Sequence, residues 1–475
     1  MGTATAAYND ITRRNLLLVA DTIREQIADA KFIAIDTEFT GLSISNASPV
    51  FGFNTQEWVT RATQMEDKYK AMSNVAKSHA LVSLGMSVFS KRHSKPGSFN
   101  VNNYNFTVQQ QNSHLISANS VAFLAQNGFD LNRQASEGIR FYAGPNPMPP
   151  VTRNELANRE GLALREIILD IIRSKVPLVI HNGLFDLVYV YQAFVGPLPD
   201  SYNAFAYDLS EMFPGGIFDT KYISEMVEPG SASFLAYTFH KNERIQKRRL
   251  EADEPAVQAK LKSPLKYQEP AEPTYPALPE AEKDIEYCLN FALHGHCRFR
   301  NKCPKSHDIN FILDCQEREE AKKKAKESGS EGPESSANGD DSKKRKRGAG
   351  DEDSADSSES DSKKAHKARK HSEEAVSKSS SGDNENMYHT AAYDAYMTGY
   401  IFASHQIRLG EGIGEYMNKV YLMGRPDQPL LIKPSLFASN SLTYVQTKPI
   451  LEKKETPAKA RPQPKSKASK DRVQK

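Results

Sequence analysis

The sequence predicts an α/β protein whose first domain is interrupted by an insertion and completed after it. Short apolar runs alternate with helical patterns over residues 9–270, which is typical of a sheet covered by helices. All four cysteines fall between Cys288 and Cys315. Residues 316–386 contain a single large apolar residue, Val376, and folded character returns only at Met387.

The first part of the domain, residues 9–270, contains most of the expected elements. Apolar residues three or four apart predict helices over 11–28 and 154–174. Apolar runs bounded by turn residues predict strands over 32–36, 80–90 and 103–108. The stretch VPLVIHNGLFDLVYVYQAF predicts a buried strand, a turn at Asn182-Gly183 and an apolar helix.

The rest of the chain divides by composition. We expect a small metal-stapled module over 281–315, followed by a disordered linker over 316–386 that cannot bury enough apolar surface to fold. Residues 387–435 predict one helix and one strand, too little for a domain, so this piece should complete the first one. The Lys- and Pro-rich tail, 446–475, is expected to be disordered.

Charge and hydropathy exclude some classes of protein. The net charge of +3 identifies no partner, so local patterns must do so. No apolar run approaches the length of a membrane span, and the N-terminus lacks the apolar core of a signal peptide. We therefore expect a soluble intracellular protein without a membrane partner.

Three acidic motifs suggest a metal site. Asp36 and Glu38 end a buried strand and point to the same side of it. Asp186 opens an apolar helix, where alone it is better explained as a helix cap. His389 and Asp394 stand five residues apart in HTAAYD. Four carboxylates can share a pocket only if cations compensate them, and oxygen ligands suit Mg²⁺ or Mn²⁺.

Two such cations would form a phosphodiester-hydrolysing centre, one activating water and the other stabilising the leaving oxygen. His389 then fits the general base, because an imidazole can take a proton at neutral pH.

The motifs DTEFTGL, HNGLFDLVYVY and HTAAYD together resemble the DEDD exonuclease family of the variety with a catalytic His, seen in deadenylases. SVAFLAQNGFDLN and FPGGIFDTKY resemble its poly(A)-specific ribonuclease branch, and nuclear deadenylases with a CCCH zinc finger are the closest match. The resemblance implies a ribonuclease-H-like fold and 3′→5′ removal of adenosines as 5′-AMP. It also implies Asp36, Glu38, Asp186 and Asp394 as ligands of two Mg²⁺ ions and His389 as the base; Asp219 should be structural or support the ligands.

The spacing Cys288-x8-Cys297-x5-Cys303-x3-His307 predicts a closed tetrahedral zinc site, leaving Cys315 as a spectator. So short a module has almost no core, so zinc should supply its folding energy. CCCH modules often read single-stranded RNA. The aromatic residues could stack on bases or pack inside the module, and neither reading prevails for two of them, Phe291 and Phe299. The flexible linker predicts a tethered finger that moves around the active site.

The basic clusters 343–347 and 363–370 lie in the linker and predict nuclear import, with the nucleolus or nuclear bodies as further destinations. We thus expect a nuclear Mg²⁺-dependent exoribonuclease acting on RNA with 3′ oligo(A) tails. The family resemblance suggests A-tailed small nuclear RNAs as its substrates. The rivals are a CCCH RNA-binding protein with a non-catalytic nuclease scaffold and a DEDD exonuclease without adenine preference. Oligomeric state and natural RNA stay open.

Overall fold

The structure is a computed structural model that describes residues 8–42, 64–92, 96–144, 155–262, 286–299, 302–327, 390–422, 428–434 and 438–452. The chain forms two compact units: residues 1–313 with 384–475, and residues 314–383. In the second unit the described residues, 314–327, continue one helix.

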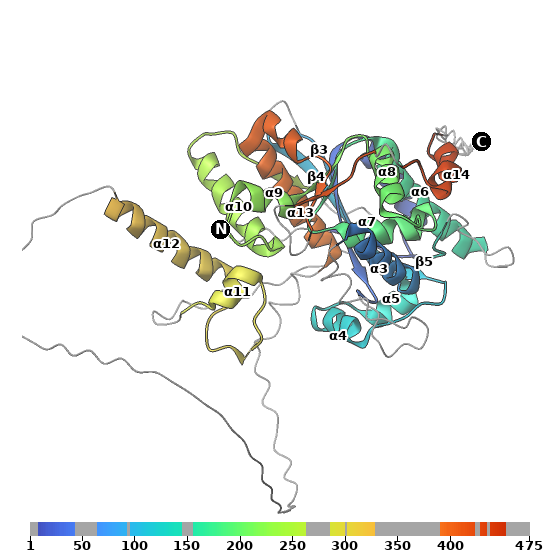
Figure 1. Cartoon of the computed structure of the whole chain (residues 1–475), viewed down its shortest axis with the longest axis horizontal. Coiled ribbons are helices and arrows are strands. Elements are labelled where there is room, and N and C mark those ends of the chain that lie inside the picture. Colours follow the sequence, from blue (N-terminus) through green and yellow to red (C-terminus); the bar gives the residue numbers. More distant parts are fainter. Residues whose placement is uncertain are drawn as a thin grey trace, which may run out of the picture. The chain divides into compact units, whose positions relative to one another are not determined.

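A mixed sheet forms the centre of the first unit (Figure 1). Within the described residues this sheet has ten strands. Eight follow the order β1-β4-β3-β2-β6-β7-β9-β10, while β5 and β8 both pair with β4. The strands are β1 (Asn9–Ile11), β2 (Ala30–Phe39), β3 (Leu81–Lys91), β4 (Ser98–Gln110), β5 (Ile139–Phe141), β6 (Leu178–Ile180), β7 (Ile217–Asp219), β8 (Gln258–Leu261), β9 (Lys419–Val420) and β10 (Leu430–Leu431).

The central strand β2 runs antiparallel to β3 and parallel to β6, so the sheet changes direction at β2. The helices are α1 (Leu16–Ala28), α3 (Met65–Ser78), α4 (Ala118–Gln126), α5 (Leu131–Glu137), α6 (Glu155–Ser174), α7 (Leu184–Val190), α8 (Tyr202–Met212), α9 (Thr220–Val227), α10 (Leu235–Glu251), α11 (Leu289–His294), α12 (Ile309–Glu327), α13 (Ala391–Leu409) and α14 (Leu442–Glu452). A π-helical turn, Tyr191–Val195, follows α7, and a 3₁₀ segment, Gly410–Tyr416, follows α13.

Two hydrophobic cores cover the two faces of the sheet. Ile33 and Ile35 of β2 belong to the larger core, which α1, α6, α7 and α8 complete. Phe32 and Ala34 point to the opposite face, where they pack with α13 and Phe239 of α10. Because side chains alternate along a strand, Asp36 and Glu38 continue the Phe32 side, the face covered by α13.

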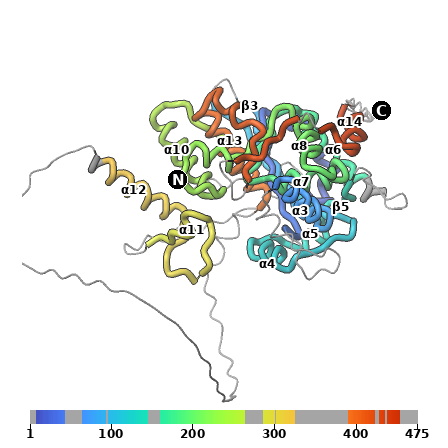
Figure 2. The backbone as a smooth tube through the Cα atoms, in the orientation of Figure 1, coloured from blue at the N-terminus to red at the C-terminus, as the bar shows by residue number. Residues whose placement is uncertain are grey.

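The C-terminal segment returns to the first domain, as predicted. Helix α13 lies beside β3 in Figure 2 and packs against both β2 and β3. Strand β9 adds to the sheet beside β7. Glycine allows the close contact: a Cβ at Gly399 would lie 2.2 Å from the Phe89 ring. Among the described residues, the strand predicted in this piece of the chain is the two-residue β9.

Two predicted disordered segments are partly helical. The linker begins inside α12, which extends to Glu327; the run from Gln316 to Glu327 is rich in Glu, Lys and Ala, which favour helix without a buried face. The tail begins inside α14, because Tyr444 is buried and the Arg173 guanidinium donates to the Ile450 carbonyl at 3.0 Å. The domain therefore extends past the predicted end at 435. Within the described residues, the structure contains no helix of the length and apolarity that a membrane span requires.

Candidate active site and zinc site

The carboxylates gather where β2, α7 and α13 meet. Oxygen atoms of Asp36, Glu38 and Asp394 all lie within 4.8 Å of one another, a spacing that one metal ion can bridge. Asp186 lies beside them, since its Oδ1 accepts a hydrogen bond of 2.5 Å from the Thr37 hydroxyl. The structure thus brings together four of the five predicted residues. His389 lies outside the described residues.

The strand end positions the first pair of acids. Asp36 pairs with Gly85 and Glu38 with Ser83 across the β2–β3 ladder, and the register shifts just after Glu38. Bulges of this kind commonly re-aim side chains next to active sites.

The turn after β6 positions Asp186. Asn182 adopts a left-handed φ of 55°, and Gly183 is the N-cap residue of α7. Asp186 then occupies the first helical turn and is not the cap, so the helix-cap explanation is wrong. It is 8% exposed.

The first turn of α13 positions Asp394. Thr390 caps the helix by accepting from the Tyr393 N–H at 3.3 Å. A Cβ at Gly85 would lie 1.8 Å from the Ala391 carbonyl oxygen, so glycine lets this helix end reach the strand beside Asp36. Gly85 is the site residue that sequence reasoning missed, although an isolated glycine in an apolar strand signals a close backbone approach.

Burial raises the pKa values of all four acids, and the charges of neighbouring carboxylates add to this. Burial, followed by the charges of neighbouring carboxylates, raises the pKa values of Asp36 and Asp394 well above the usual range. The same two causes raise the pKa of Glu38 to about 8. Burial raises the pKa of Asp186 to about 6, against the lowering effect of the Thr37 hydrogen bond. Such a set is stable in its ionised form only when cations neutralise it.

Asp219 has a structural position. Its carboxylate is fully buried and accepts from the backbone N–H groups of Asn182, Lys221 and Tyr421 at 2.9–3.0 Å. It thereby fastens the turn before Asp186 to the returning C-terminal segment. Burial raises its pKa to about 6.

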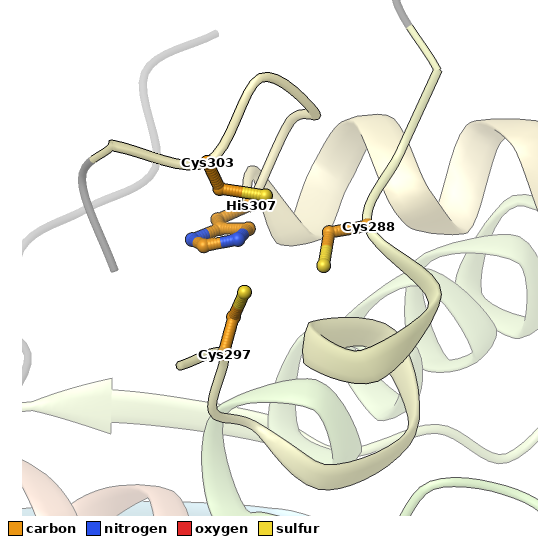
Figure 3. A group of neighbouring side chains, drawn as sticks. All are labelled: Cys288, Cys297, Cys303 and His307. Carbon is orange, nitrogen blue, oxygen red and sulfur yellow. The ribbon is translucent and has the colours of Figure 1, made fainter. Parts of the chain in front are cut away.

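The predicted zinc ligands also converge. Atoms of Cys288, Cys297, Cys303 and His307 lie within 4.8 Å of one another, and their side chains surround a common point (Figure 3). Among the described residues, the buried Nε2 of His307 has no hydrogen-bond partner. Three thiols and an imidazole with an unsatisfied nitrogen fit zinc. Cys315 stands outside the cluster.

The finger is more than a metal-held knuckle. Ala292, Ile312 and Leu313 are buried, so the start of α12 gives it a small core. Phe291 stacks on the His307 ring with centroids 4.5 Å apart, whereas Phe299 is 51% exposed beneath the Arg298 guanidinium. Phe291 therefore packs inside the finger, and Phe299 remains available for a ligand.

The chain matches the CAF1 family ribonuclease over residues 11–147 and 146–402. The pre-piRNA 3′-exonuclease trimmer of Bombyx mori is 50% identical over 50 residues, 10% of this chain and 9% of that protein. The human poly(A)-specific ribonuclease PNLDC1 is 34% identical over 55 residues, 12% and 10% of the two chains. This chain thus aligns with about a tenth of the length of each of these relatives.

A putative CCR4-associated factor 1 homolog of Arabidopsis thaliana is 25% identical over 213 residues, covering 44% of this chain and 72% of that protein. Among solved structures, Mg²⁺- and Mn²⁺-bound S. pombe Pop2p has 19% identity and a TM-score of 0.35, covering 50% of this chain and 82% of the other.

The family match confirms the predicted DEDD-type exoribonuclease class and the α/β ribonuclease fold. The predicted likeness to nuclear CCCH deadenylases in particular stays a prediction, as do the individual roles of the five site residues. With a match that spans most of the sequence, this chain belongs to the CAF1 ribonuclease family.

Proposed function

We propose that this protein is a 3′→5′ exoribonuclease that removes adenosines from RNA 3′ tails and releases 5′-AMP. The observation that supports it most is the meeting of Asp36, Glu38 and Asp394 from both sides of the insertion, with Asp186 beside them. Family membership supports the reaction class. The relatives named as a poly(A)-specific ribonuclease and a 3′-exonuclease support the 3′ end and the adenine preference.

The four carboxylates would hold two divalent cations, which when bound activate water and stabilise the leaving 3′ oxygen. The chain's own contribution is placement. Thr37 orients one oxygen of Asp186, and the close Gly85–Ala391 contact fixes Asp394 against the strand end. His389, five residues before Asp394 in the sequence, is proposed to take the proton from the attacking water.

We further propose that the zinc finger adds affinity for RNA and that the basic clusters 343–347 and 363–370 direct nuclear import. Phe299 is the aromatic side chain of the finger that supports base stacking, with Arg298 held against its ring at 4.7 Å. A-tailed small nuclear RNAs are the proposed natural substrates.

The test is trimming of 5′-labelled RNAs that share one body and end in A, U, C or G tracts, with Mg²⁺. The proposal predicts stepwise shortening from the 3′ end, fastest on the A tract, and 5′-AMP as product. Equal rates on all four tails would leave an exonuclease without adenine preference. Binding without shortening would instead favour the RNA-binding alternative.

A further inference from the structure

The finger is seated on the nuclease through one aromatic side chain. Phe234, the residue before α10, meets the edge of Phe291 with centroids 6.1 Å apart and planes at 69°. Gly295 has a left-handed φ of 70°, and a Cβ there would lie 2.9 Å from the Phe234 ring. The finger therefore presents both a ring and a bare backbone to Phe234.

A second contact lies at the other end of the finger. The Arg244 guanidinium of α10 donates to the backbone and side-chain oxygens of Asn310 at 3.1 and 3.2 Å. Two separated attachments hold the finger to one helix. The described residues therefore show the finger docked on α10, whereas the linker alone predicts a tethered finger that moves.

The same helix packs against the part of α13 that begins the metal site. Phe239 of α10 lies edge-on to Tyr393, Tyr396 and Tyr400, with centroids 6.1, 5.9 and 5.3 Å away. Tyr393 directly precedes Asp394, and its backbone N–H donates a hydrogen bond to the side chain of the helix cap, Thr390. Aromatic contacts therefore run from the zinc ligand His307 through Phe291 and Phe234 to α10, and from α10 to the first turns of α13.

We infer that the zinc-loaded finger is a brace of the active site and that Phe234 is the positioning residue through which it acts. Bound zinc would fix the position of His307, and the Phe291 ring stacks on His307. Phe234 packs against Phe291 and is the N-cap residue of α10, so the finger would stabilise the position of α10. The first turns of α13 are then held against β3. This inference rests on the proposed function only where it takes Asp394 to be a metal ligand.

The N-terminal end of α13 depends on few contacts for its stability. Residues 328–389 lie outside the described residues, so within the described part of the chain the N-terminal end of α13 is held by its Thr390 cap and by packing against its neighbours. A helix end frays unless caps or neighbours hold it, and here one neighbour is α10. A finger that loses zinc should unfold, and it then no longer supports α10.

The test uses hydrogen exchange of the full-length chain without Mg²⁺, so that it needs no catalysis. Cys297→Ser removes a zinc ligand, and Phe234→Ala removes the contact while keeping the ligand set. Each should speed exchange in residues 391–397 by roughly two- to tenfold, the range expected from losing an aromatic pair. Phe234→Ala should retain one zinc per chain. Phe299→Ala, an exposed aromatic of the same finger, should leave this exchange unchanged.

A further variant tests the second contact between the finger and α10, without changing the zinc ligands or the Phe234 contact. Arg244→Gln keeps Phe234 and removes the hydrogen bonds to Asn310, so it should change the same peptides to a smaller extent. The half-saturating Mg²⁺ concentration for thermal stabilisation should rise in the same order of variants. Unchanged exchange of residues 391–397 in Cys297→Ser and Phe234→Ala would overturn the inference. If the wild type trims RNA but exchange of residues 391–397 is unchanged in the variants, only the brace inference fails. If the variants alter this exchange but the wild type trims no RNA, only the proposed function fails.

Discussion

Gly85 and Ala391 touch backbone to backbone at the point where the two parts of the split domain meet. A side chain of even one carbon on Gly85 would fall 1.8 Å from the Ala391 carbonyl oxygen. Gly85 pairs with Asp36 across the sheet, and Ala391 begins the helix that carries Asp394. The carboxylate pocket therefore depends on a contact between residues 306 positions apart (391 − 85).

Gly85→Ala should push α13 away from β3, lowering the free energy of unfolding by about 1–3 kcal/mol, as overpacking does. RNA trimming should fall further than stability, because Asp394 moves with the helix. Thermal melts and single-turnover trimming measure both. Gly412→Ala, where a Cβ meets nothing within 4 Å, is the matched control. Equal trimming by the two variants would show that the contact does not position the pocket.

Asp36→Asn should keep the shape of the site while removing one charge from it. We expect trimming reduced by orders of magnitude and a weaker stabilisation by Mg²⁺, with melting in the absence of metal unchanged or higher. Calorimetric titration with Mg²⁺ is the measurement, and Asp29→Asn, at the exposed end of α1, is the control. Normal trimming by Asp36→Asn would remove Asp36 from the metal site.

The Mg²⁺-free protein should lose stability as pH rises from about 4 to 8. The folded-state pKa values of Asp186, about 6, and Glu38, about 8, exceed the ordinary 3.8 and 4.5, so the folded state binds more protons in this window. Stability is then fully present at low pH and decreases as the acids ionise. Mg²⁺ should therefore raise the melting temperature more at pH 8 than at pH 5.

Melting curves at several pH values with and without Mg²⁺ test this relation. The double variant Glu38→Gln with Asp186→Asn should flatten the pH dependence of the metal-free protein. A wild-type melting temperature that rises from pH 5 to 8 without metal would contradict the raised pKa values.

His389→Ala should slow the chemical step about 10²–10⁴-fold, the usual contribution of a general base, while Mg²⁺ and RNA binding persist. The rate should recover at high pH, where hydroxide replaces the base. Single-turnover trimming across pH is the measurement. An unchanged rate in the variant at neutral pH would assign the base to another group.

Replacing Lys343 to Arg347 by Ala should move the protein from nucleus to cytoplasm, with trimming in extracts unchanged. Imaging of a fluorescent fusion measures the shift, and the same replacement over 363–370 is the comparison. Nuclear accumulation that survives both replacements would reject the basic clusters as the import signal.

The sequence predicts which acidic residues line the pocket better than it predicts the tertiary contacts that position them. Alternation along β2 places Asp36 and Glu38 on one side, and apolar periodicity finds α1 and α6. The role of Gly85 is a property of two segments far apart in sequence, so no local pattern reveals its partner Ala391. The end of α14 is similar, because the Arg173–Ile450 hydrogen bond stabilises a segment whose composition alone indicates disorder.

The docking of the finger is hidden from sequence for the same reason. Phe234 lies before a charged helix and Gly295 after a short one, and neither has a spacing that links them. Their contact depends on the tertiary placement of α10. The cysteine spacing, by contrast, is local, and it predicts all four ligands.

Asp394, from beyond the insertion, completes one pocket with Asp36 and Glu38. The most direct measurement is Mg²⁺-dependent 5′-AMP release from an A-tailed RNA by the wild type and by Asp394→Asn, titrated over Mg²⁺ concentration. We expect saturable release by the wild type and, in the variant, a loss of orders of magnitude in rate with weaker Mg²⁺ binding. Wild-type release and Mg²⁺ dependence in Asp394→Asn would contradict it.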